Sequence, residues 1–281
     1  MKFKIQHTTN YQYSQLVKLS PQDLRFYPRD DGSQRVINFQ LNIDPIPHGR
    51  NDHLDLEGNR VIQVWFEGET NHFNIQLNME VETLRKNAFD FILASEAEFL
   101  PINHVEDFIF TQGYLERISP DNAVFSFAKE ISRSVNNNTL GFLNTLSQKL
   151  FEDFIHIHRE SGIPQTPGHT LQTRHGACRD LAVLFIDSCR SQGIAARFAS
   201  GYQKGDLKSE RRHLHAWPEV YLPGAGWIGY DPTHGMAIAD THVTIAAAAH
   251  ARNTMPVIGH FIGEGVNSTL NYSVQIQVSD S

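Results

Sequence analysis

The sequence has little cysteine and no long apolar run. Its two cysteines are Cys178 and Cys189. On the single helix that their surroundings predict, they would lie roughly 16 Å apart, too far for a disulfide. The absence of a disulfide framework fits a reducing compartment. No stretch approaches the ~18 consecutive apolar residues of a membrane-spanning helix, and the first residues lack the apolar core of a signal peptide. We therefore expect a cytoplasmic protein without a membrane partner.

An excess of basic residues is also missing. The chain has 24 Lys and Arg against 31 Asp and Glu, for a net charge of −7, the opposite of a typical nucleic-acid binder. Histidine is abundant, and His156-x-His158 and His213-x-His215 suggest metal ligands. Neither a His-Glu-x-x-His nor a Cys-x-x-Cys pattern accompanies them, so we expect no metal, no cofactor and no nucleic acid.

The residues from 174 to 234 contain the parts of a thiol nucleophile. Cys178 precedes an apolar run at 181–186, which predicts a helix that begins near the cysteine. Unpaired N–H groups at a helix start favour a thiolate. His215 can take up and return a proton near neutral pH, and a carboxylate such as Asp231 can orient it. The order Cys, His, Asp thus predicts cysteine-dependent acyl transfer.

A predicted β-hairpin brings the last two of these residues together. The turn sequence Pro223-Gly224-Ala225-Gly226 separates strand-like segments at 217–222 and 227–231. Pairing across this turn places His215 and Asp231 level within a few residues. The exact register stays open, because the sequence does not specify it.

The same stretch resembles a known family. The motifs Gly176-x-Cys178-x-Asp180, His215-Ala216-Trp217 and the run 226–233 (GWIGYDPT) are similar to the transglutaminase-like superfamily, in its bacterial branch of cysteine proteases with a papain-like core. The resemblance implies Cys178 as nucleophile, His215 as base and acid, and Asp231 as orienting carboxylate.

The resemblance also implies an oxyanion hole, formed by the backbone N–H of Cys178 and a side-chain donor upstream of the cysteine. Gln172 is the candidate for that donor. Trp217 lies next to the predicted histidine strand, so it belongs either to the protein core or to the wall of a substrate cleft.

Outside this stretch, alternation of apolar and polar residues predicts half-buried antiparallel strands over the first eighty residues and again at 270–278. Helical spacing follows at 124–135 and 143–154. We predict an α+β fold with an antiparallel β-sandwich at 1–100, a papain-like transglutaminase core at 101–245 and a C-terminal segment at 246–281. The final strand is expected to return to the sheet. The first region resembles the N-terminal region that accompanies bacterial transglutaminase-like cores, and we expect it to pack or shape the substrate without chemistry of its own.

Three functions are compatible with these residues. In a thiol hydrolase, water would release the acyl group from a thioester formed with a peptide or protein amide. In a transglutaminase, an amine would take that acyl group. In the third function, the protein would be a binding module without catalytic activity. We expect hydrolysis, because no calcium-loop signature is present and the resembled branch contains proteases; the oligomeric state stays open.

Overall fold

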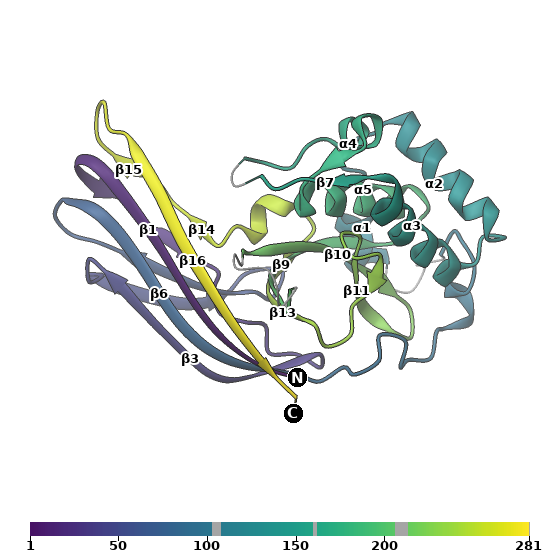
Figure 1. Cartoon of the computed structure of the whole chain (residues 1–281), viewed down its shortest axis with the longest axis horizontal. Helices are drawn as coiled ribbons and strands as arrows, with labels where there is room; N and C mark the ends of the chain where they lie inside the picture. Colours follow the sequence, from purple (N-terminus) through teal and green to yellow (C-terminus); the bar gives the residue numbers. More distant parts are fainter. Residues whose placement is uncertain (103–107, 160–161, 206–212, 281) are drawn as a thin grey trace.

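The computed structural model describes residues 1–102, 108–159, 162–205 and 213–280. Figure 1 shows a long, curved sheet on one side of the molecule and a mixed α+β body on the other. The predicted α+β class with a β-rich N-terminal part is confirmed. Among the described residues, no helix is both long and apolar enough to cross a bilayer.

Two antiparallel sheets form the N-terminal sandwich. The first has the order β15-β1-β6-β3, with β16 also paired to β1, and the second has the order β14-β2-β5-β4. The strands of the first are β1 (Lys2–Leu19), β3 (Gln34–Asp44), β6 (Thr70–Thr83), β15 (Phe261–Ile262) and β16 (Ser268–Ser279). Those of the second are β2 (Gln22–Leu24), β4 (Gly49–Leu54), β5 (Arg60–Trp65) and β14 (Val257–Ile258). Alternating residues of β1 and β6 are buried between the sheets, as the period-two pattern predicts.

The last strand returns to the first sheet, which confirms the prediction. β16 runs antiparallel to β1, from Lys2 opposite Ser279 to Tyr13 opposite Ser268. The two chain ends therefore lie close together (Figure 1). The sheet therefore contains both β1 and β16, so the sandwich is built from strands at both ends of the sequence.

The second part of the molecule is built around a buried helix. The helices are α1 (Phe108–Leu115), α2 (Asn122–Ser134), α3 (Thr139–Asp153), α4 (Pro167–Thr173) and α5 (Cys178–Ser191), with 3-10 turns at Ser95–Ala97 and Ala251–Thr254. The sheet order is β12-β11-β10-β9-β13. Its strands are β9 (Ala196–Gln203), β10 (His215–Leu222), β11 (Gly226–Asp231), β12 (Met236–Ala237) and β13 (His242–Ala248). A short pair, β7 (Ile155–His156) with β8 (His175–Gly176), completes the set. α5 contacts β10, β9, α2 and α4, so its sides are covered by protein (Figure 1).

The sandwich is joined to this second sheet along the outer edge of β13, the last strand in the sheet order. The Gln34 side chain accepts a hydrogen bond from the Thr244 N–H at 2.8 Å and donates one to the Thr244 carbonyl at 2.8 Å. Asn59 makes the same two bonds with Ala247, each at 2.9 Å. Each side-chain amide thus satisfies the backbone groups that a neighbouring strand would otherwise pair. The edge is closed, and the sheet that bears His215 is fixed to the sandwich.

Candidate active site

Cys178 is the first residue of α5, and a buried carboxylate holds the helix start in place. Asp180 Oδ2 accepts a hydrogen bond from the Ala177 N–H at 2.8 Å. Its Oδ1 accepts from the Gln165 N–H at 2.8 Å and pairs with Arg159 at 2.6 Å. Asp180 therefore caps the helix and anchors the preceding loop. Gly176 leaves room for this contact, since a Cβ there would lie 2.9 Å from the Asp180 Cβ.

The β10–β11 hairpin brings His215 to Asp231, as predicted. Glu219 pairs with Gly229 and Leu222 with Gly226, so the turn lies where the sequence places it. His215 Nε2 lies 2.9 Å from Asp231 Oδ2. The imidazole is 13% exposed and the carboxylate is fully buried. With Nε2 engaged by the carboxylate, the ring nitrogen Nδ1 is left for the thiol.

Cys178 and His215 shift each other's proton affinity in opposite directions. Burial alone would raise the pKa of the thiol. Hydrogen bonds to the sulfur from His156 and His215, the charge of His215 and the Ala216 N–H outweigh burial and lower the pKa from 9.0 to about 6. Burial alone would lower the pKa of His215, but the Asp231 charge and hydrogen bond, together with Cys178, raise it to about 10. Near neutral pH the two groups form a thiolate–imidazolium pair.

Asp231 is the centre of a histidine cluster. Its Oδ2 lies 2.9 Å from His234 Nδ1 and 3.0 Å from His242 Nε2, in addition to His215. Its Oδ1 accepts from the Thr233 N–H at 2.9 Å and hydroxyl at 2.6 Å. Burial would raise the pKa of this carboxyl, but the charge of His215 and the three imidazole hydrogen bonds hold it well below 3.8. The carboxylate is thus ionised and fixed from several sides.

The cluster also has the spacing of a possible metal site. One ligand atom each from His215, Asp231 and His234 lies within 4.8 Å of the others, and this is the one such group among the described residues. Each imidazole nitrogen, however, lies 2.9 Å from the same carboxylate oxygen, which is the distance of N–H donation. The arrangement is complete as a hydrogen-bond network around Asp231.

The two remaining candidate residues have different surroundings. Trp217 is 1% exposed, stacks beside His215 with ring centroids 6.1 Å apart and meets His242 edge-on at 4.9 Å. The cleft-wall expectation for Trp217 is therefore corrected: a buried indole has no surface to offer a substrate, and it supports the histidines from behind. Gln172 lies on α4 with an exposed side chain, and its oxyanion role stays a prediction.

Three histidines of the site were not predicted to take part in it. His156 contacts the thiol, and His234 and His242 contact Asp231. His156 comes from β7, whose parallel pairing places it opposite Gly176, two residues before the cysteine. The one available signal was the His156-x-His158 pattern, which resembles a metal motif more than a thiol contact.

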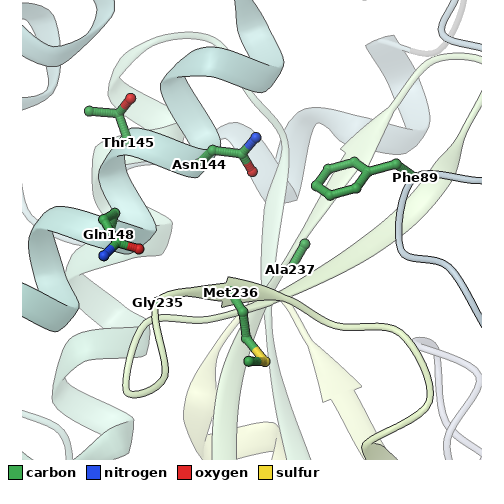
Figure 2. Close-up of a pocket in the computed structure, with 7 residues that line it drawn as sticks. All are labelled: Phe89, Asn144, Thr145, Gln148, Gly235, Met236 and Ala237. Atoms are coloured by element: carbon green, nitrogen blue, oxygen red, sulfur yellow. The ribbon is translucent and has the colours of Figure 1, made fainter.

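A separate cavity of about 550 Å³ lies away from the cysteine. Figure 2 shows its lining from α3, from Gly235 and the two residues of β12, and from Phe89. No side chain that bonds to Asp231 lines it, although Met236 of the lining pairs with Asp231 across β11 and β12. Gly235 of the lining directly follows His234 in the chain, but the lining has no ionisable side chain.

Comparison with known proteins agrees with this architecture. A family model described as the bacterial transglutaminase-like N-terminal region matches residues 3–82, and one described as the transglutaminase-like superfamily matches residues 126–232. An uncharacterized protein of Mycobacterium tuberculosis is 22% identical, over 98% of this chain and 92% of its own. A protein-glutamine gamma-glutamyltransferase of Pseudomonas aeruginosa is 38% identical over 23% of this chain and 11% of its own.

Among solved structures, a protein of Cytophaga hutchinsonii described as a "putative cysteine protease" has the same fold. The TM-score is 0.74 at 20% sequence identity, and the alignment covers 100% of this chain and 91% of the other. The matched core contains Cys178, His215 and Asp231. The chain has a core of the transglutaminase-like superfamily at 126–232, a family of cysteine-dependent acyl transfer, behind a bacterial transglutaminase-like N-terminal region at 3–82.

Proposed function

We propose that this protein is a thiol hydrolase that cleaves amide bonds in peptides or proteins. The observation that carries the proposal is the pairing of Cys178 with His215. The cysteine stands at a helix start with its pKa lowered to about 6, and it contacts an imidazole whose pKa is raised to about 10. A buried structural thiol has neither a charged partner nor access to solvent, whereas Cys178 is half-buried.

In the proposed reaction the three residues have different roles. The Cys178 thiolate attacks the carbonyl carbon, a C–S bond forms, and the C=O π pair moves to oxygen. When the C–N bond breaks, the His215 imidazolium gives its proton to the leaving amine. Neutral His215 then takes a proton from water as the water attacks the thioester, and the C–S bond breaks. Asp231 holds the ring orientation throughout and stabilises the imidazolium.

Transfer of the acyl group to an amine is the second candidate. It uses the same three residues and replaces water by a lysine side chain or a polyamine. The relative from Pseudomonas aeruginosa, named as a protein-glutamine gamma-glutamyltransferase, favours it over the matched segment. The Cytophaga hutchinsonii protein, described as a "putative cysteine protease", has the matching fold over the whole chain. We place hydrolysis first.

The deciding experiment compares the two acceptors directly. The protein is incubated with a mixed peptide library in the presence of a fluorescent primary amine, and mass spectrometry counts new carboxyl termini and amine adducts. Hydrolysis predicts new free acids with few adducts. Dominant amine incorporation would make the protein a transglutaminase. Cys178→Ala is the control and should produce neither.

The same experiment tests the inert-module alternative. In that case neither product forms with the native chain, and no thioester adduct of Cys178 is found after rapid acid quenching. An adduct on Cys178 in the native protein, absent from His215→Ala, would instead establish the acyl-enzyme even when turnover of the library is slow.

A further inference from the structure

A second imidazole reaches the thiol from a different part of the chain. His156 lies in β7, where the Ile155 N–H donates to the Arg174 carbonyl at 2.8 Å and the Ile157 N–H donates to the Gly176 carbonyl at 3.0 Å. These two bonds enclose His156 and fix its backbone to the segment that leads into Cys178. The exposed side chain is close enough to the sulfur to lower the pKa of the thiol. A substrate bound at the sulfur would therefore meet this ring.

The two imidazoles at the sulfur have different surroundings. His215 is backed by the buried Asp231 carboxylate, which holds its proton for transfer to a leaving group. Among the described residues no carboxylate is paired with His156. Without a carboxylate behind it, His156 is suited to donate a hydrogen bond, while the Asp-backed imidazole of His215 performs the proton transfer.

The chemistry of the proposed reaction requires such a donor. Attack by sulfur turns the carbonyl oxygen into an oxyanion bonded to the carbon that carries the sulfur. A donor near the sulfur is also near that oxygen, because only one carbon atom separates the two. His156 is such a donor, and it lies on a different strand from His215. The Cys178 N–H, at the first position of α5, has no intrahelical acceptor and is a second donor there. Gln172 lies on α4 with an exposed side chain.

We propose that His156 is the side-chain donor of the oxyanion hole. This inference rests on the proposed acyl transfer at Cys178. In the step, the C–S bond forms, the π pair moves to the carbonyl oxygen, and a His156 N–H shifts its hydrogen bond from the sulfur to that oxygen without giving up its proton. When the pair returns to re-form C=O, the C–N bond breaks and the proton for the amine comes from His215.

Two reagents distinguish stabilisation of the oxyanion from activation of the thiol. p-Nitrophenyl acetate acylates the cysteine through a tetrahedral oxyanion, and release of p-nitrophenol reports the first turnover. Iodoacetamide alkylates the same sulfur by displacement, without an oxyanion. Both rates are measured at pH 8.5, where the thiol is ionised. Three variants are compared with the native chain: His156→Ala, His156→Gln, which keeps an N–H donor, and His158→Ala, which removes a neighbouring exposed imidazole of the same segment.

His156→Ala should slow acylation about 100-fold, the usual cost of removing one oxyanion donor, and change alkylation less than about threefold. His156→Gln should recover at least about tenfold of the lost acylation rate, and His158→Ala should leave both rates within about twofold. An equal loss in both reactions would overturn the proposal, because His156 would then act on the thiolate. Unchanged acylation in His156→Ala would also overturn it.

Failure of the underlying function looks different. It would appear in the native chain itself, as no p-nitrophenol burst and slow alkylation that is insensitive to His215→Ala. A native burst that depends on His215 but not on His156 would leave acyl transfer standing and remove only the role assigned to His156.

Discussion

The two ends of α5 carry the two cysteines of the chain, and the helix gives them opposite chemistry. Cys178 is the first helical residue and half-buried, while Cys189 lies near the other end and is fully enclosed. The pKa of Cys178 is lowered to about 6. Burial raises the pKa of Cys189 well above 9.0, and nearby Arg190 offsets little of it.

The difference lies in where the hydrogen-bond donors point. At Cys178, two imidazoles and the Ala216 N–H are directed at the sulfur. Beside Cys189, the Arg190 guanidinium donates to the backbone carbonyls of Ala196, Ala249 and Glu116. A neighbouring positive charge is therefore not enough to make a thiolate. Burial opposes ionisation at both positions, and donors aimed at the sulfur reverse it at one of them.

Replacing each cysteine separately by alanine should give the largest difference in activity. Cys178→Ala removes the nucleophile, so turnover of any amide substrate should fall on the order of 10⁵-fold, whereas Cys189→Ala should keep activity within about twofold. Initial rates of peptide cleavage, normalised to folded protein by circular dichroism, measure both. Equal activity of the two variants would mean that α5 has no catalytic cysteine.

Replacing the carboxylate behind the histidine should have a smaller effect. Asp231→Asn keeps a similar shape but removes the charge that orients His215, so turnover should fall about 10³-fold. Asp187→Asn is the matched control, because Asp187 is also buried and pairs with Arg117 at 2.6 Å on the far side of α5. It should lower thermal stability and leave the rate per folded molecule unchanged. If both variants lost the same activity, Asp231 would have a structural role only.

The sequence predicted the triad because each part has a local signature. The helix start, the two strands and the turn at Gly224 are each encoded by consecutive residues, and the hairpin then fixes His215 relative to Asp231. The sandwich strands were predictable for the same reason, since one face of each is buried and the apolar residues alternate.

What the sequence did not predict depends on contacts between distant segments. β7 has two residues, too few to show any periodicity, so the approach of His156 to the cysteine has no local sign. His242 reaches Asp231 from β13, on the other side of β9. The position of Trp217 was open because β10 is buried on both faces, and alternation then carries no information about which way a side chain points.

The pH dependence of alkylation should sharpen the comparison between the cysteines. The pKa values of about 6 for Cys178 and about 10 for His215 predict that iodoacetamide labelling rises through pH 6 and stays level to about pH 10, as the thiol loses its proton before the imidazolium does. Turnover should follow the same lower limb and fall above about pH 10, where His215 has no proton for the leaving amine. Cys189 should stay unlabelled throughout in folded protein.

His215→Ala is the matched variant for this profile. Without the imidazolium, the thiol pKa should return towards 9.0, so labelling at pH 7 should fall roughly 30-fold and recover at alkaline pH. Mass spectrometry assigns the label to each cysteine. Labelling of Cys178 that begins only at alkaline pH in the native chain would contradict the ion pair, and unchanged labelling in His215→Ala would assign the low pKa to the other donors.

The smallest effect should be on stability. Here the order of the two cysteines is reversed, because replacing Cys189 should cost more than replacing Cys178. Cys189→Ala leaves a space in the core cluster, where the sulfur is fully enclosed, so the free energy of unfolding should fall by about 1–2 kcal/mol and Tm by a few degrees. Cys178→Ala removes a half-buried sulfur at a helix start and should change stability by less than about 0.5 kcal/mol. Thermal unfolding followed by circular dichroism measures both. If Cys178→Ala were the more destabilising change, the sulfur at the helix start would serve mainly in packing. The low pKa of Cys178 would then no longer be evidence that this end of α5 is the catalytic one.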